Sequence, residues 1–152
     1  MFTSPALASV GMTDQQARTA GIRCDSRVLP LAHVPRAIVK RDTRGLIKIV
    51  TDADTGRIIG ITALAQDAGD LAAAGVYILE AGMTTDQVAN LWSPYLTMAE
   101  GLKLTAQTFT TDITKLSCCA AMNPHRDPYT GASSLATSVV RFGSVRDRTL
   151  LR

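Results

Sequence analysis

The sequence predicts an α+β fold in which an antiparallel β-sheet packs with helices, followed by an irregular C-terminal tail. Strand-like alternation of apolar and polar residues is found in the first half of the chain, and a tight turn joins two of the predicted strands. Helical periodicity with capping boxes dominates the stretch after them. The 152 residues fit one domain and are enough for a sizeable core.

The first elements are predicted in the order strand, helix, strand. Ala6 to Met12 is predicted to be a short buried strand, and Thr13-Asp14-Gln15-Gln16 is a capping box that opens a helix ending near Gly21. In Ile22 to Val28, apolar or small residues alternate with charged ones, which is typical of a half-buried strand. This alternation predicts that Cys24 lies on the inward face, as a buried and inert thiol.

A hairpin is the next predicted unit. Another strand is expected from Arg36 to Arg41, and two more from Leu46 to Val50 and from Ile58 to Ile61. The segment Asp54-Thr55-Gly56 between the last two has the residues that a tight reversal requires.

Helices are predicted for the rest of the folded part. Asp67 to Ala81 has small and apolar residues along one side and is stopped by Gly82. A capping box at Thr84 to Gln87 opens a second helix, which Pro94 breaks. The side chains that this helix is expected to bury are Val88, Leu91 and Trp92.

Glu100 and Tyr95 are candidate site residues that also fit purely structural roles. Thr97-Met98-Ala99-Glu100 is a capping box that opens a third helix, so the Glu100 carboxylate has a structural use without catalysis. Tyr95 fits a turn between two helices, with its ring packed and its hydroxyl exposed.

The adjacent thiols of Cys118 and Cys119 are a candidate binding site for a soft metal ion. Thiolate sulfur is polarizable and prefers soft cations. A closed zinc site is not expected, because Cys24, His33 and His125 lack the spacing of a second ligand pair. Two structural roles are also open to the two cysteines, either as small residues in a tail or as a strained vicinal disulfide.

Several runs resemble the C-terminal end of mercuric reductase, namely Pro94 to Leu104, Ala106 to Phe109 and Lys115 to Ala121. The likeness starts at Phe2-Thr3-Ser4-Pro5. It implies that residues 1–121 form the dimerisation domain that closes FAD-dependent pyridine nucleotide-disulfide oxidoreductases. Residues 122–152 depart from the family and are expected to be a disordered extension, rich in Pro, Gly, Ser, Thr and Arg.

The resemblance also implies roles for the candidate residues. Disulfide-reducing relatives carry a His-Pro-Thr motif and a following glutamate at the partner subunit's active site, whereas this chain has Tyr95-Leu96-Thr97 and keeps Glu100. A phenol with a pKa near ~10 does not replace imidazole as a proton shuttle at neutral pH. In mercuric reductases the C-terminal cysteines take Hg(II) and pass it to a cysteine pair beside the partner's flavin, where NADPH reduces it to Hg(0). Cys118 and Cys119 correspond to those cysteines.

The chain lacks the cofactor-binding motifs of such an enzyme. No G-x-G-x-x-G follows a strand and no C-x-x-x-x-C pair is present, so FAD and NADPH are expected to bind domains that this chain does not contain. We therefore expect a fragment that forms a homodimer and is inactive alone. Two alternatives remain: a standalone soft-metal thiol-binding module, and a purely structural dimerisation fragment with inert cysteines.

Composition argues against nucleic-acid and membrane partners. The net charge is +3, but five arginines fall within residues 126–152, and no stripe of basic and aromatic residues appears elsewhere. No apolar stretch approaches the ~18 residues that a membrane span needs. No signal peptide is recognisable, and three cysteines favour a reducing compartment, so a cytoplasmic location is expected.

Overall fold

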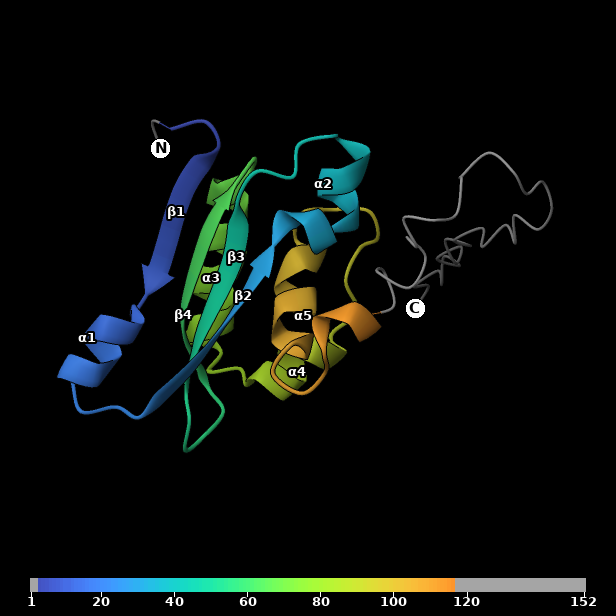
Figure 1. Ribbon diagram of the computed structural model, residues 1–152. Coiled ribbons are helices and arrows are strands. Elements are labelled where there is room, and N and C mark those ends of the chain that lie inside the picture. Colours follow the sequence, from blue (N-terminus) through green and yellow to red (C-terminus); the bar gives the residue numbers. More distant parts are fainter. Residues whose placement is uncertain (1–2, 117–152) are drawn as a thin grey trace, which may run out of the picture.

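The computed structural model describes residues 3–116 as a four-stranded antiparallel sheet with helices packed on one of its faces (Figure 1). The strand order is β1-β4-β3-β2. In chain order the elements are β1 (Ala6–Gly11), α1 (Asp14–Thr19), β2 (Cys24–Pro30), the 3-10 turn η1 (Leu31–His33), α2 (Pro35–Val39), β3 (Leu46–Asp52), β4 (Ile58–Ala65), α3 (Ala68–Glu80), α4 (Thr85–Asn90), α5 (Glu100–Gln107) and the 3-10 turn η2 (Ile113–Lys115). The predicted α+β class is confirmed.

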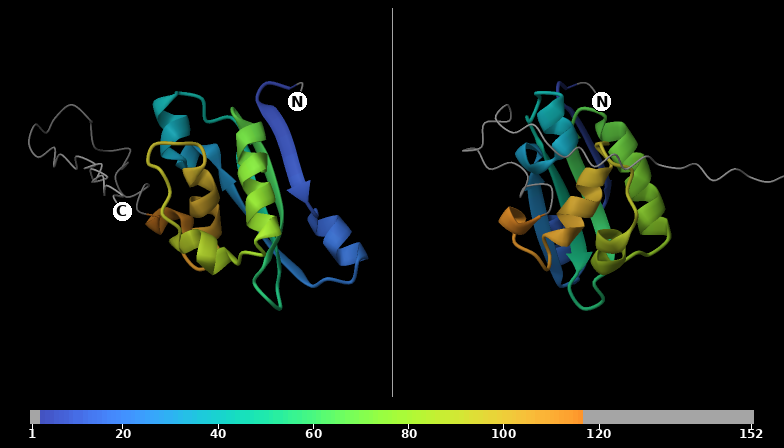
Figure 2. Two further views of the ribbon diagram at one scale, coloured as in Figure 1. Left: turned by 180° about the vertical axis from the view of Figure 1, so that it is seen from behind. Right: turned by 90° about the vertical axis from the view of Figure 1, so that its right-hand side faces the viewer.

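The two longest helices, α3 and α5, cover the same face of the sheet (Figure 2). Helix α3 lies on β1 and β4, and α5 lies on β3 and β2. A glycine on each helix lets the helix approach the sheet closely. A Cβ on Gly75 of α3 would lie only 2.8 Å from Cγ1 of Val10, and a Cβ on Gly101 of α5 only 2.4 Å from Cδ1 of Ile47. The core therefore forms between the sheet and these helices, and includes the fully buried Leu29, Ile47, Ile49 and Leu71.

The predicted hairpin and the first two capping boxes are confirmed. Strands β3 and β4 pair across the turn at Asp54-Thr55-Gly56, and Gly56 has the positive φ of 70° that favours glycine. Thr13 caps α1 and Thr84 caps α4, each accepting a hydrogen bond from the backbone N–H three residues later. Helix α3 also lies where the sequence predicts it, and Gly82 follows it in the left-handed region.

The predicted strand from Arg36 to Arg41 is wrong, because this segment contains the short helix α2. Pro35 occupies the first turn of the helix, where its fixed φ suits the helix and its missing N–H is not needed. Arg41 then adopts a left-handed φ of 55°, which ends the turn and redirects the chain toward β3.

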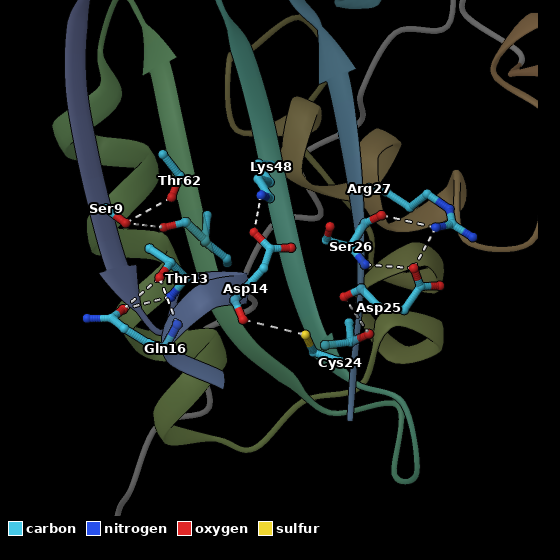
Figure 3. A network of polar contacts seen from close by, with 12 residues as sticks. Ser9, Thr13, Asp14, Gln16, Cys24, Asp25, Ser26, Arg27, Lys48 and Thr62 are labelled. Carbon is cyan, nitrogen blue, oxygen red and sulfur yellow. Dashed lines mark hydrogen bonds and ion pairs between the residues drawn. The ribbon is translucent and has the colours of Figure 1, made fainter. Parts of the chain in front are cut away.

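The inward position predicted for Cys24 is also wrong. Leu29 pairs with Ile47, whose side chain meets α5, so Leu29 and Arg27 face the helices. Cys24 and Val28 therefore lie on the opposite face. The alternation assigns the charged residues to the outward face, but Arg27 points toward the helices. There its guanidinium group stacks over the Phe109 ring, 5.2 Å from the ring centroid. Cys24 is half-buried, with its Sγ 3.8 Å from the carbonyl oxygen of Asp14 (Figure 3).

Candidate functional site

The loop between α4 and α5 carries Tyr95 and ends at Glu100. Thr97 holds this loop in place: its hydroxyl donates to the carbonyl oxygen of Pro94 at 2.8 Å and accepts from the backbone N–H of Glu100 at 3.4 Å. The chain thus reverses between the two helices and leaves the Tyr95 side chain 76% exposed.

Only half of the predicted capping box at Thr97 forms. Helix α5 begins at Glu100, later than predicted, with Ala99 at the N-cap and no side-chain cap. The Glu100 carboxylate does not reach back to the Thr97 backbone; instead its Oε2 atom is buried without a hydrogen-bond partner in the described part of the chain. The capping role therefore does not account for this carboxylate.

The environment of Glu100 changes its acidity. Burial raises the pKa of the Glu100 carboxyl above its ordinary value, and the positive charge of Lys103 opposes this shift only in part. The buried Oε2 of Glu100 receives no hydrogen bond from the Tyr95 hydroxyl. Within residues 3–116, therefore, the two predicted site residues share a loop but do not form a bonded pair like a His-Glu dyad.

An apolar groove lies beside this loop, where α3, α4 and α5 meet. It has a volume of about 430 Å³ and is lined mostly by apolar side chains, among them Tyr77, Leu91 and Trp92. These three side chains are 75%, 44% and 84% exposed. Exposed aromatic and aliphatic side chains grouped in this way are typical of a surface that binds another protein.

The groove corrects the prediction that Leu91 and Trp92 belong to the core. Helix α4 ends at Asn90, and Leu91 is already extended with ψ of 143°, so of the three side chains predicted to be buried only Val88 is. Pro94 does not end the helix directly, since it lies four residues beyond Asn90. Proline restricts only the residue before it, Ser93, so it does not account for the exposure of Leu91 and Trp92.

The predicted metal ligands Cys118 and Cys119 lie outside the described residues, as does the predicted extension from residue 122. Among residues 3–116, no group of three or more His, Cys, Asp or Glu side chains is placed to hold a metal ion. No helix in this part of the chain is long and apolar enough to cross a bilayer.

The described fold does not fit FAD or NADPH. Dinucleotides bind where a parallel βαβ unit turns through a glycine-rich loop into a helix. All strand pairings within residues 3–116 are antiparallel, which leaves no such unit there.

A known protein family matches most of this chain. The family model described as "Pyridine nucleotide-disulphide oxidoreductase, dimerisation domain" matches residues 1–106. The chain belongs to this family. The resemblance inferred from the sequence is thereby confirmed at the level of the dimerisation domain.

Curated relatives of this dimerisation domain include several mercuric reductases. The chain is 56% identical to the mercuric reductase of Streptomyces lividans over 119 residues, which are 78% of this chain and 25% of the relative. It is 48% identical to that of Shigella flexneri over 120 residues, which are 79% of this chain and 21% of the relative. The chain thus spans about a quarter or less of the length of these relatives.

Solved structures with the same fold include a flavoprotein disulfide reductase. The HOCl-induced flavoprotein disulfide reductase RclA from Escherichia coli matches with a TM-score of 0.66 and 32% identity, over 70% of this chain and 24% of that one. LpdA from Mycobacterium tuberculosis also has a TM-score of 0.66, at 23% identity over 72% of this chain and 24% of that one, and shows the shared fold alone.

Proposed function

We propose that this chain is the dimerisation and Hg(II)-accepting domain of a mercuric reductase, the enzyme type that reduces Hg(II) to Hg(0) with NADPH. The observation that carries the proposal is the 56% identity to the Streptomyces lividans mercuric reductase over most of the chain. Because the chain spans a quarter of that relative, FAD and NADPH would be bound by other domains, and the isolated chain would not turn over. The odd cysteine count fits a cytoplasmic location.

The acceptor of Hg(II) in this proposal is the thiol pair of Cys118 and Cys119. Two adjacent thiolates hold a soft, two-coordinate cation and release it by exchange with other thiols. Residues 1–121 would form the domain, and residues 122–152 an added extension.

Tyr95 and Glu100 would act at the partner subunit's site. Tyr95 supports Hg(II) rather than a disulfide as substrate, because the disulfide-reducing relatives use an imidazole at this position as their proton shuttle and this chain does not have one. Glu100 has a buried oxygen without a partner in the described chain, which is consistent with a donor that is supplied on assembly.

A second copy of the chain is the proposed partner for the apolar groove. The groove is rimmed by Tyr77 and Trp92, which are the kinds of residues that dominate protein interfaces. A symmetric homodimer would bury this surface on both copies and bring the Tyr95 loop, which adjoins it, to the subunit boundary.

Titration with Hg(II) tests the acceptor role. The reduced chain is titrated in competition with a small dithiol, while the thiolate-to-mercury charge-transfer absorbance is followed. We expect about one tight equivalent in the natural chain and in Cys24→Ala, and its loss in the double variant Cys118→Ala/Cys119→Ala. Equal, weak binding by all three proteins would reject the acceptor role and leave a structural dimerisation domain.

A further inference from the structure

Residues 112–116 are the last that the structure describes before the proposed acceptor thiols, and they form a closed turn. The carboxylate of Asp112 accepts hydrogen bonds from the backbone N–H of Thr114 at 2.8 Å and from its hydroxyl at 2.6 Å. Backbone hydrogen bonds from Lys115 to Asp112 and from Leu116 to Ile113 complete the turn. The turn thus sets the direction in which the chain arrives at Leu116.

Leu116 fastens the end of this turn to the domain. Its side chain is 2% exposed and belongs to the hydrophobic core, and Phe109 and Ile113 pack against the same core. Because exposing a buried leucine side chain to water is unfavourable, the chain is held at this point. We call residues 112–116 the anchor.

The anchor lies beside α4 and α5 (Figure 1). A hollow of about 360 Å³ is lined there by residues of all three elements, among them Asn90, Gln107 and Leu116. The side-chain amide of Gln107 on α5 donates to the carbonyl oxygen of Ala89 on α4 at 3.3 Å. Helix α4 also lines the apolar groove, through Val88. The chain therefore leaves the anchor beside a helix that borders the surface proposed for the second copy.

The anchor limits how far the thiol pair can reach. An extended chain spans at most ~3.6 Å per residue, so the Cα atoms of Cys118 and Cys119 can lie at most roughly 7 and 11 Å from that of Leu116. If the tether began at Gln107, where α5 ends, the reach to Cys118 would be roughly 40 Å. Confinement to a smaller volume raises the effective concentration of the thiols at a nearby target.

We propose that Leu116 is a positioning residue for Hg(II) transfer, and this inference rests on the function proposed above. It holds Cys118 and Cys119 beside α4, so that a short tether brings them to a receiving pair of thiols on the partner subunit. In the transfer, two sulfur–mercury bonds to Cys118 and Cys119 break and two form with the receiving thiols. The protons of the receiving thiols pass to the released thiolates, and mercury stays in the +2 state.

Lengthening the tether in a hybrid enzyme tests this role. The matched 119 residues of the Streptomyces lividans reductase are replaced by this chain, and a Gly-Ser-Gly-Ser segment is inserted before Cys118 or, as the control, after Ala121. The NADPH-reduced hybrid is mixed with less than one equivalent of Hg(II), and the rate of the single turnover is measured. We expect the rate to fall roughly tenfold or more with the first insertion and to stay unchanged with the second. Equal rates, or a faster rate with the longer tether, would overturn the proposal.

Substitution of the anchor itself is the second test. Leu116→Ala is expected to slow the single turnover as the longer tether does, whereas Leu116→Met keeps the rate. The control is Leu104→Ala, which truncates an equally buried leucine of α5 away from the tether. Equal slowing by both alanine variants would mean that only general stability is involved, and the positioning role would be rejected.

Trypsin reports on the anchor without mercury, because Lys115 directly precedes Leu116. In the 152-residue chain, Leu116→Ala is expected to raise the rate of cleavage after Lys115 roughly tenfold or more relative to the natural chain and to Leu104→Ala. A natural chain cleaved there as fast as Leu116→Ala would show that Leu116 does not hold the chain.

Failure of this inference differs from failure of the proposed function. A hybrid without insertion or substitution that does not reduce Hg(II) would reject the mercuric reductase assignment, and the positioning role with it, although trypsin would still detect the anchor. An active hybrid whose rate ignores both tether length and Leu116→Ala would keep the assignment and overturn the positioning role alone.

Discussion

The ammonium group of Lys48 on β3 forms an ion pair with the carboxylate of Asp14 on α1, across the face of the sheet that α3 and α5 leave open. The two side chains are 29% and 23% exposed, so the pair is better shielded from water than the exposed pair of Arg23 and Asp54. The contact joins the second element of the chain to the centre of the sheet and fixes α1 there.

Lys48→Gln is expected to lower the free energy of unfolding by about 1 kcal/mol, since the shielded Asp14 carboxylate loses its partner. The hydrogen bond from Lys48 has the largest effect in lowering the pKa of Asp14 below its ordinary value of 3.8, and a hydrogen bond from Ser26 lowers it further. Stability from this pair is therefore present above pH 3.8 and is lost as the pH falls through the lowered folded pKa. Urea unfolding from pH 7 downward measures it.

The matched control is Arg23→Gln, which removes a pair whose side chains are 73% and 61% exposed. We expect no measurable change for this variant. If Lys48→Gln lowered the free energy of unfolding by the same amount at low pH as at pH 7, lost packing rather than the ion pair would be responsible.

Glu100→Gln is expected to stabilise the chain at neutral pH. The folded-state pKa of Glu100 is raised by burial, so its carboxyl favours the folded state fully below pH 4.5, and this contribution is lost as the pH rises through the folded pKa. The amide has no such loss. We expect a gain of roughly a few tenths of a kcal/mol at pH 7, because water screens the partly exposed group. Denaturant unfolding of both proteins from pH 4 to 8 measures the difference.

Glu80→Gln serves as the control, because Glu80 is an exposed carboxylate at the end of α3. If the stability difference between Glu100→Gln and the natural chain were the same at every pH, the assigned titration of Glu100 would be wrong.

Gly60→Ala is expected to destabilise the fold by about 3 kcal/mol. A Cβ at this position would lie 1.9 Å from the carbonyl oxygen of Met12, a backbone atom that cannot move aside without shifting the chain between β1 and α1. Gly75→Ala is the comparison: its new methyl group would meet the side chain of Val10, and alanine favours the helix by about 1 kcal/mol. Thermal unfolding should therefore show a much larger loss for Gly60→Ala, and equal losses would contradict the backbone clash.

Trp92→Glu is expected to weaken the homodimer at least roughly thirtyfold, or ~2 kcal/mol, because an exposed tryptophan that lines an apolar groove is the kind of residue that dominates binding. Sedimentation equilibrium of the 152-residue chain measures the dissociation constant. Val39→Glu, on an exposed residue of α2 outside the groove, should leave it unchanged. A Trp92→Glu dimer of normal strength would place the dimer contact elsewhere.

Much of the fold could be predicted from short-range sequence signals. The capping boxes at Thr13 and Thr84, the turn at Asp54-Thr55-Gly56 and the stop at Gly82 are all confirmed. Each depends on hydrogen bonds or backbone angles within a few residues, so the local sequence specifies it. The segment after Pro35 is the exception, because its apolar residues fit a strand as well as the first turn of a helix.

The α+β class, the family and the candidate residues Tyr95, Glu100, Cys118 and Cys119 all follow from the amino-acid sequence alone. Which surfaces the elements present is settled by tertiary packing instead. The residues that face the helices depend on strand register, which arises from packing between distant segments, and this places Cys24 and Val28 on the sheet face opposite α3 and α5. For the same reason Trp92 is exposed and Oε2 of Glu100 is buried, since burial depends on neighbours far away in the sequence.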